Sequence, residues 1–261
     1  MKVVVLAGGY GSRLLEETVI KPKPMVEIGG RPILWHIMST YAAYGCKEFV
    51  IALGYKGDYI KNYFIARYHM QGSITVNLGN GSVKLHDEQV KHDWLIHLMD
   101  TGLDTATGGR LLRLRDQLKD ETFMFTYGDG VSDVNIEELL RFHKSHGKLV
   151  TVTAVRPPAR FGILDFEDEA TPIVTRFGEK PQLSEGWING GYFVVEPAAL
   201  QYLGGETEAW EGAPLQRLTE DRQLVAYRHG GFWQCMDTLR DVKYLDELWT
   251  GNKAPGNVWS D

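Results

Sequence analysis

Cysteine is scarce in this sequence. The 261 residues include two cysteines, Cys46 and Cys235, which lie far apart along the chain. Two cysteines are too few for a disulfide framework or for a cysteine-rich zinc site. The cysteine content therefore predicts a protein of a reducing compartment, and the chain is long enough to bury a sizeable apolar core.

Long hydrophobic runs and an excess of positive charge are also missing. No run of 18 apolar residues and no signal-peptide pattern is present, so we expect a cytoplasmic protein that does not enter a membrane. The formal net charge of −6 argues against nucleic acid as a partner. An anionic substrate would therefore need a local pocket of basic residues.

Several motifs that carry chemistry in other proteins are absent. None of the eight histidines has the His-Glu-x-x-His spacing of a zinc site. A glycine loop follows the first strand, but no Lys-Ser/Thr follows its last glycine, which excludes the Walker pattern. Leu14 stands where a dinucleotide fingerprint needs its third glycine, so hydride transfer on a Rossmann domain is disfavoured.

The N-terminus carries the strongest positive signal. A β-branched run at 1–6 predicts a buried strand, and three glycines follow within residues 8–11. Arg13 and Lys23, the second within Lys-Pro-Lys-Pro, add two cations. Glycines let backbone N–H groups approach anionic oxygens closely, so this order predicts a phosphate cradle. A glycine-rich hairpin without a ligand is the alternative, and the two cations disfavour it.

Strand and helix patterns alternate along the chain. Strands 1–6 and 49–53 are each followed by a helical pattern, at 32–44 and after residue 57. This alternation predicts an α/β fold with a parallel sheet covered on both faces. We further expect strands at 94–99, 123–127, 149–155, 187–195 and 224–228, hairpins at 74–85 and 162–176, and helices at 135–146, 213–218 and after 237.

Two aspartates are candidate metal ligands. Asp129 stands between glycines after strand 123–127, at the edge where open α/β sheets bind ligands, and its carboxylate could hold Mg²⁺. An aspartate in a tight turn explains the same pattern about as well. Asp237 precedes the last helix, so its alternative role is the helix N-cap, which Thr238 could share.

Three other groups are ambiguous on residue chemistry alone. Thr105 could cap a helix, and Arg110 could be a solvated helix residue. Glu179–Lys180 before Pro181 could be a surface charge pair. Asn189–Gly190 interrupts a strand in a way that often lets a ligand come close.

A longer ordered pattern resolves these ambiguities. Gly-Gly-x-Gly-Ser-Arg-Leu at 8–14, Pro-Lys-Pro-Met at 22–25 and Ile-Gly-Gly-Arg-Pro-Ile at 28–33 resemble the signature of sugar-1-phosphate nucleotidyltransferases, and the resemblance covers nearly the whole chain. It implies one domain over residues 1–261. The implied fold is Rossmann-like, with a mixed, mostly parallel sheet flanked by helices and small β additions.

The resemblance assigns a role to each candidate. Arg13, Lys23 and Asp129 are implied as catalytic, Asp129 and Asp237 as ligands of Mg²⁺, and Glu179, Lys180, Asn189 and Gly190 as contacts of the sugar phosphate. The implied nucleotide contacts are Leu6, Ala7, Gly8, Gly9, Tyr10, Gly11, Ser12, Arg13, Lys23, Thr105, Arg110 and Asp129.

Other segments resemble one branch of that family, the glucose-1-phosphate cytidylyltransferases. These are Leu-Glu-Glu-Thr at 15–18 and the stretches 26–38, 107–111, 125–133, 187–191 and 231–241, whereas 67–92 matches least well. The branch makes CDP-glucose and pyrophosphate from CTP and α-D-glucose 1-phosphate, for dideoxysugars of surface polysaccharides such as the lipopolysaccharide O-antigen. Resemblance to this branch also implies a homo-oligomer, a hexamer.

Three alternatives stay open. The chain could use UTP or dTTP, or it could be a catalytically silent regulator that binds a sugar nucleotide. A metal-dependent glycosyltransferase is disfavoured because Gly128-Asp129-Gly130 replaces the Asp-x-Asp usual in that class.

Overall fold

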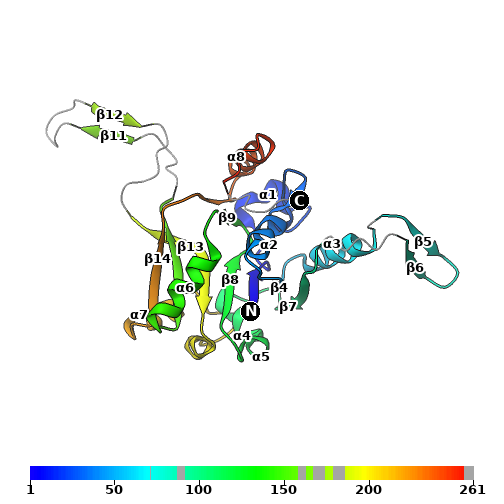
Figure 1. Cartoon of the computed structure of the whole chain (residues 1–261), viewed down its shortest axis with the longest axis horizontal. Coiled ribbons are helices and arrows are strands. Elements are labelled where there is room, and N and C mark those ends of the chain that lie inside the picture. Colours follow the sequence, from blue (N-terminus) through cyan, green and yellow to red (C-terminus); the bar gives the residue numbers. More distant parts are fainter. Residues whose placement is uncertain (71, 87–91, 158–162, 167–173, 179–185, 256–261) are drawn as a thin grey trace.

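A seven-stranded mixed sheet forms the centre of the computed structural model (Figure 1). The structure describes the whole chain except residues 71, 87–91, 158–162, 167–173, 179–185 and 256–261. The strands lie in the order β14-β10-β13-β8-β1-β4-β7. Their bounds are β1 Lys2–Leu6, β4 Glu48–Leu53, β7 Leu95–Asp100, β8 Phe123–Tyr127, β10 Val150–Val155, β13 Ile188–Val195 and β14 Leu224–His229.

The pairing confirms the predicted mixed, mostly parallel sheet. β1 pairs in parallel with both β4 and β8, β4 pairs in parallel with β7, and β10 pairs in parallel with β14. β13 runs antiparallel to both of its neighbours, β8 and β10. Val3, Val4 and Val5 are fully buried, which explains why β1 reads as an unbroken apolar run rather than an alternating one.

Helices cover both faces of the sheet. The helices are α1 Leu15–Thr18, α2 Ile33–Ala43, α3 Gly57–His69, α4 Thr107–Arg113, α5 Arg115–Leu118, α6 Ile136–His146, α7 Ala213–Glu220 and α8 Leu239–Thr250, with short 3₁₀ turns at Ser12–Leu14, Lys23–Met25 and Pro197–Tyr202. Val3 and Val5 pack into one apolar cluster with residues of α2, α3, α6 and α8. Val4 and Leu6 pack into a second cluster with residues of α4, α5 and α7.

Four small antiparallel ribbons complete the fold, as the predicted β additions. They pair β2 Glu27–Ile28 with β3 Arg31–Pro32, β5 Ile74–Asn77 with β6 Ser82–Leu85, β9 Gly130–Ser132 with β15 Trp233–Cys235, and β11 Ile163–Phe166 with β12 Val174–Gly178. The β5–β6 hairpin projects beyond α3, away from the sheet (Figure 1). The predicted hairpin at 74–85 is therefore confirmed, and so is the predicted pairing of strands near 162–166 and 173–176 for the residues that the structure describes.

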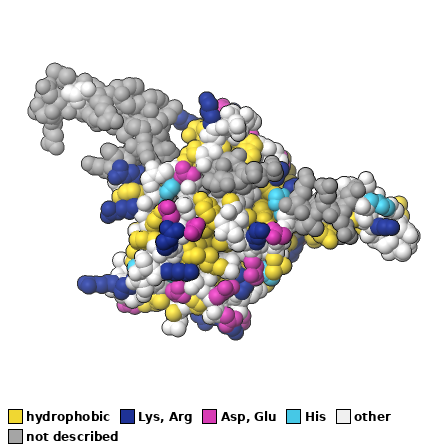
Figure 2. All heavy atoms as spheres, viewed as in Figure 1, with side chains coloured by type: hydrophobic (Ala, Val, Ile, Leu, Met, Phe, Trp, Pro, Cys, Tyr) yellow, Lys and Arg dark blue, Asp and Glu magenta, His cyan; other side chains and the backbone are white. Residues whose placement is uncertain are grey.

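The surface carries charges of both signs. On the face drawn in Figure 2, acidic and basic side chains of the described residues are interspersed rather than gathered by sign. Of the helices in the described part of the chain, none has both the length and the apolar character that crossing a membrane requires.

Candidate active site

The carboxyl ends of β1 and β8 open into a cavity of the described part of the chain. These strands are parallel neighbours, and their last residues, Leu6 and Tyr127, are paired. The glycine loop after β1 and the Gly-Asp-Gly turn after β8 therefore leave the sheet side by side. Both line a cavity with a volume of about 1540 Å³. This is the edge at which open α/β sheets bind ligands.

Two glycines shape the loop after β1. Gly11 has a φ of 66°, a left-handed conformation that favours glycine. A Cβ on Gly8 would lie 2.2 Å from the Nη1 atom of Arg110, so only glycine leaves room for that guanidinium. The Thr18 hydroxyl donates to the carbonyls of Gly11 (3.3 Å) and Leu14 (3.0 Å), which ties the loop to α1. The loop is therefore held in a defined shape.

Arg110 holds this loop in place through hydrogen bonds to backbone carbonyls. Its buried guanidinium donates to the Gly8 carbonyl at 3.0 Å and to the Leu53 carbonyl at 3.0 Å. It also donates to Thr101 Oγ1 and to the carbonyls of Gly102 and Leu103. Burial lowers the pKa of Arg110 from its usual value. Arg110 lines the cavity as predicted. Because its side chain is buried, the alternative interpretation as a solvated helix residue is wrong.

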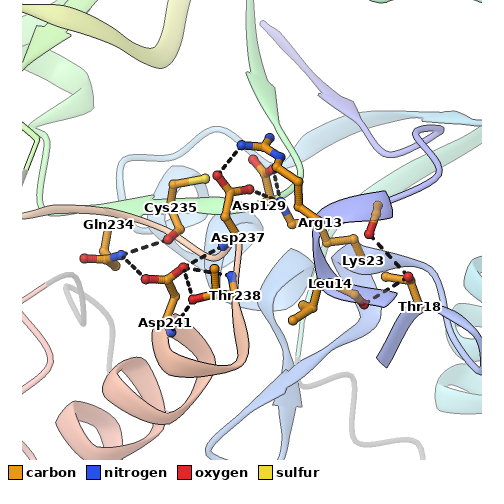
Figure 3. Close-up of polar contacts among 11 residues, drawn as sticks. Arg13, Leu14, Thr18, Lys23, Asp129, Gln234, Cys235, Asp237, Thr238 and Asp241 are labelled. Carbon is orange, nitrogen blue, oxygen red and sulfur yellow. Dashed lines mark hydrogen bonds and ion pairs between the residues drawn. The ribbon is translucent and has the colours of Figure 1, made fainter. Parts of the chain in front are cut away.

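Lys23 lies between two carboxylates at the floor of the cavity. Its buried ammonium donates to Asp129 Oδ2 at 2.7 Å and to Asp237 Oδ1 at 2.6 Å (Figure 3). The Arg13 guanidinium contacts the second oxygen of Asp237. The side chain of Arg13 is 69% exposed, whereas that of Asp237 is 11% exposed. Two cations and two carboxylates thus form one cluster.

The electrostatics of this cluster favour the charged forms. Burial opposes the charge of Lys23, but attraction and hydrogen bonds from Asp129 and Asp237 outweigh it and raise the pKa of Lys23. Burial also opposes the charge of Asp237, and the nearby Lys23 and Arg13 nevertheless lower the pKa of Asp237. Burial, reinforced by Asp129 and Asp237, raises the pKa of the Cys235 thiol.

The β9–β15 ribbon brings the two aspartates together. Cys235 pairs with Gly130 in this ribbon, and the Met236 N–H donates to the Asp129 carbonyl at 2.8 Å. Asp237 follows at once, so its carboxylate lies beside that of Asp129. The ligand atoms of Asp129, Cys235 and Asp237 lie within 4.8 Å of one another.

The first turn of α8 fixes the backbone at Asp237. Thr238 is the N-cap of α8 and forms a reciprocal capping box with Asp241. Asp241 Oδ2 also accepts from the Asp237 N–H at 3.0 Å (Figure 3). The proposed cap role for Asp237 is therefore wrong: Thr238 caps the helix, and the Asp237 side chain is free to face Lys23.

A second polar cluster forms another wall of the cavity. The Tyr127 hydroxyl donates to Glu211 Oε1, and the Thr107 hydroxyl donates to Glu211 Oε2 at 2.6 Å. The Asn189 side-chain amide donates to the Tyr127 oxygen at 3.2 Å. Burial first, and then Glu211, raise the pKa of Tyr127, so its phenol keeps its proton. These residues present a polar wall of fixed hydrogen-bond geometry.

The structure brings most of the predicted site residues to one cavity. Its lining includes Leu6, Ala7, Gly8, Gly9, Gly11, Ser12, Arg13, Lys23, Thr105, Arg110, Asp129, Asn189, Gly190 and Asp237. The Tyr10 side chain instead donates to Asp104 Oδ1 at 2.6 Å and packs on Tyr55. Thr105 does not cap α4, because Ala106 is its N-cap. Glu179 and Lys180 lie outside the described residues.

Sequence reasoning missed several residues of the lining. Cys235, Glu211 and Asp241 all line the cavity. Cys235 could have been noticed because it lies two residues before Asp237. Glu211 gave no signal, since it stands in an irregular stretch before α7.

The family now follows from comparison with known proteins. Residues 2–254 match the family described as nucleotidyl transferase. The chain belongs to the nucleotidyl transferase family. It is 48% identical, over 99% of its own length and all of the relative's, to the glucose-1-phosphate cytidylyltransferase of Salmonella typhi. It is 40% identical, with the same coverage, to a probable glucose-1-phosphate cytidylyltransferase of Bacillus subtilis.

A solved structure shares the fold of this chain. The crystal structure of HddC from Yersinia pseudotuberculosis superposes with a TM-score of 0.68 at 21% identity. The superposition covers 95% of this chain and 99% of that one. At this identity the likeness supports the fold alone.

The donor set of the cluster fits a divalent metal ion. Asp129 and Asp237 offer carboxylate oxygens, the ligands that Mg²⁺ prefers together with substrate phosphates. The Lys23 ammonium bridges both carboxylates, which shows that the space between them accepts a cation. In a nucleotidyl transferase, these two aspartates are the residues that would hold such an ion.

Proposed function

We propose that this chain transfers a cytidylyl group from CTP to α-D-glucose 1-phosphate, giving CDP-glucose and pyrophosphate. The observation that carries the proposal is the 48% identity over the whole length of a glucose-1-phosphate cytidylyltransferase. The cluster of Lys23, Asp129 and Asp237 beside a glycine loop supports the same type of reaction. CTP and glucose 1-phosphate are cytoplasmic metabolites, so the proposal includes a cytoplasmic location.

The reaction needs positioning and charge neutralisation rather than a covalent nucleophile. A phosphate oxygen of glucose 1-phosphate attacks the α-phosphorus of CTP in line, and the bond to pyrophosphate breaks on the opposite side. Both substrates are highly anionic, so the enzyme must hold two polyanions close together. Preorganised cations and backbone amides do this without reorganisation during the reaction.

Each residue of the cluster has a role in this scheme. The N–H groups of residues 8–12 bind the triphosphate, and Arg13 stabilises the charge that develops on pyrophosphate. Lys23 draws the α-phosphate and the sugar phosphate together from the buried floor of the cavity. To stabilise pyrophosphate, Arg13 must exchange its contact with Asp237 for a contact with a phosphate. Its exposed side chain permits this exchange.

Asp129 and Asp237 are the proposed ligands of Mg²⁺. When bound, the ion neutralises phosphate charge and polarises the reacting phosphoryl group. The sugar phosphate is assigned to Asn189 and Gly190 on the cavity wall, together with Glu179 and Lys180. These four assignments come from the family resemblance.

We also propose that the chain forms a homo-oligomer. The β5–β6 hairpin exposes Ile74, Val76, Leu78 and Val83. A lone two-stranded hairpin is marginally stable in water, and exposed apolar side chains in a cluster are typical of an interface. Leu78 is 93% exposed, so Leu78→Asp should lower the mass measured by light scattering without unfolding the subunit. Lys84→Ala, on the same hairpin, is the matched control.

The deciding experiment is pyrophosphate release with purified protein, Mg²⁺ and glucose 1-phosphate. CTP, UTP, dTTP, ATP and GTP are compared in parallel. A preference for CTP of tenfold or more in kcat/KM corresponds to about 1.4 kcal/mol and supports the proposal. Release with UTP or dTTP instead would refute the cytidylyl assignment, and silence with every nucleotide would favour a sugar-nucleotide-binding regulator.

A further inference from the structure

A thiol lies within the cluster of catalytic carboxylates. Cys235 stands opposite Gly130 in the β9–β15 ribbon, so its side chain is held beside Asp129 by strand register. Figure 3 shows its sulfur close to the carboxylate of Asp237. Sγ of Cys235 and one oxygen from each aspartate lie within 4.8 Å of one another. The other cysteine, Cys46, is buried in the apolar core.

This thiol changes the metal preference of the cluster. Two carboxylates alone form a hard oxygen site, which suits Mg²⁺. A thiolate is a soft ligand that selects Zn²⁺ and similar thiophilic ions over Mg²⁺. A zinc site that is open to substrate usually has three protein ligands and a fourth position for water or substrate.

A cation already stands at this position. The Lys23 ammonium is 2.7 Å from Asp129 and 2.6 Å from Asp237, and a bound ion would take over these contacts. The carboxylates are therefore oriented toward a common point before any metal arrives. Small rotations about the side-chain bonds of Asp129 and Cys235, which are partly exposed, would bring three ligand atoms to one ion.

We propose that Asp129, Cys235 and Asp237 form a binding site for a thiophilic divalent cation such as Zn²⁺ or Cd²⁺, which inhibits the enzyme by replacing Mg²⁺. The ion takes the place of the thiol proton, which leaves to solvent, and no group is oxidised or reduced. The binding site is independent of the proposed function, whereas the inhibition rests on it.

Charge explains why such an ion would inhibit. Two carboxylates with Mg²⁺, the Lys23 ammonium and the Arg13 guanidinium would leave two net positive charges facing the incoming phosphates. A thiolate as third ligand lowers that charge to one, so the cluster attracts polyanionic substrates less strongly. Soft-metal binding would also hold Asp237 away from its contacts with Lys23 and Arg13.

The binding site is tested by titrating Cd²⁺ into the protein without nucleotide. Bound Cd²⁺ gives a thiolate-to-metal charge-transfer absorption in the ultraviolet. Cys46→Ala leaves Cys235 as the chain's one thiol, and Cys235→Ser replaces its sulfur by oxygen. We expect one thiolate band per chain in the wild type and in Cys46→Ala, and none in Cys235→Ser. A missing band in folded Cys46→Ala, or a band retained in Cys235→Ser, would overturn the proposal.

Inhibition is tested by adding Zn²⁺ to the pyrophosphate-release assay at fixed Mg²⁺. Each variant is compared with its own rate without zinc. Loss of a direct ligand should raise the inhibitory zinc concentration at least about tenfold in Cys235→Ser, since even indirect partners of a metal contribute 10–100-fold. Equal zinc sensitivity of the wild type and Cys235→Ser would refute the proposed inhibition through Cys235. Cys235→Ala is the second variant if the serine form does not fold.

Failure of the proposed metal site can be distinguished from failure of the proposed function. The cadmium band is read without substrate, so it decides the metal site even if no nucleotide releases pyrophosphate. Absence of pyrophosphate release with every nucleotide would refute the proposed function and leave the band unaffected.

Discussion

Arg13 and Lys23 contact the same carboxylate from different environments. Lys23 is buried with two carboxylate partners, whereas Arg13 reaches Asp237 from an exposed position. A buried ion pair is fixed in place, while an exposed one contributes little to stability. Lys23 therefore orders the resting cavity in addition to its proposed part in catalysis, and the exposed Arg13 is available for its proposed contact with a phosphate.

Arg13→Ala should separate catalysis from folding. We expect kcat to fall by about 10²–10³, the usual loss when one donor aimed at developing charge is removed. The melting temperature should change little, because the Arg13 side chain is 69% exposed and Asp237 keeps its buried partner Lys23. Steady-state pyrophosphate release and a thermal melt measure the two effects. Arg141→Ala, which breaks an exposed pair with Glu137, is the control. A near-normal kcat in folded Arg13→Ala would refute the proposed role of Arg13 in stabilising pyrophosphate.

Arg110 should behave in the opposite way, as a structural residue that also shapes the glycine loop. Arg110→Lys replaces a planar guanidinium, which donates to five acceptors, by a single ammonium. The Gly8 carbonyl then keeps only the N–H of Tyr55 as a donor, and the buried hydrogen-bond network around residue 110 is lost. We expect a loss of about 2–4 kcal/mol in the free energy of unfolding, measured by urea denaturation.

The matched control lies on the same helix. Arg113 is paired with Glu206 at the surface, so Arg113→Lys should cost less than about 1 kcal/mol. Equal losses in the two lysine variants would contradict the structural role of Arg110.

At the scale of elements, the start of α8 links helix capping to the position of Asp237. Asp241→Ala removes both the capping box and the acceptor of the Asp237 N–H. We expect a stability loss of about 1 kcal/mol together with a lower kcat and a higher requirement for Mg²⁺. Unfolding curves and pyrophosphate release against Mg²⁺ concentration measure these effects.

α6 supplies the control for capping alone. Asn135 caps α6 by accepting from the Glu138 N–H at 3.0 Å, and no residue of α6 lines the described cavity. Asn135→Ala should cost a similar amount of stability and leave the magnesium dependence unchanged. If the two variants alter only stability, the link between the cap and Asp237 is wrong.

The elements themselves were largely predictable from the sequence. Buried strands such as β1 and β8 are short apolar runs with turn residues after them. Asn80-Gly81 is a local turn signal, and it lies in the 78–81 loop of the β5–β6 hairpin. The local sequence pattern did not predict which residues cap the helices. Thr238 rather than Asp237 caps α8, because the choice depends on a cluster formed by residues distant in sequence.

The site was predictable where a motif is contiguous and not where strand register builds it. The glycine loop and Asp129 directly follow recognisable strands, and Lys23 stands in the contiguous motif Pro-Lys-Pro-Met. The approach of Cys235 to Asp129 depends on the β9–β15 pairing, which joins residues more than 100 positions apart. The buried position of Arg110 depends on space left by glycines at 8 and 54, which no local pattern reveals.

At the scale of the whole molecule, both apolar clusters share one sheet. Alternate residues of β1 enter the cluster under α2 and the cluster under α4, so neither cluster exists without the same strand. This supports the expectation of a single domain over residues 1–261. The catalytic cavity lies at the carboxyl edge of that shared sheet, and its geometry depends on both clusters.

A cavity introduced in either cluster should therefore weaken the whole molecule. Ile37 and Leu111 are fully buried on opposite faces, and Ile37→Ala or Leu111→Ala should each cost about 2–5 kcal/mol. In each variant, tryptophan fluorescence and far-ultraviolet circular dichroism should shift to the same new urea midpoint, because one cooperative transition gives coincident probes. Midpoints that separate in either variant would mean that the two faces unfold independently and that the chain contains two units.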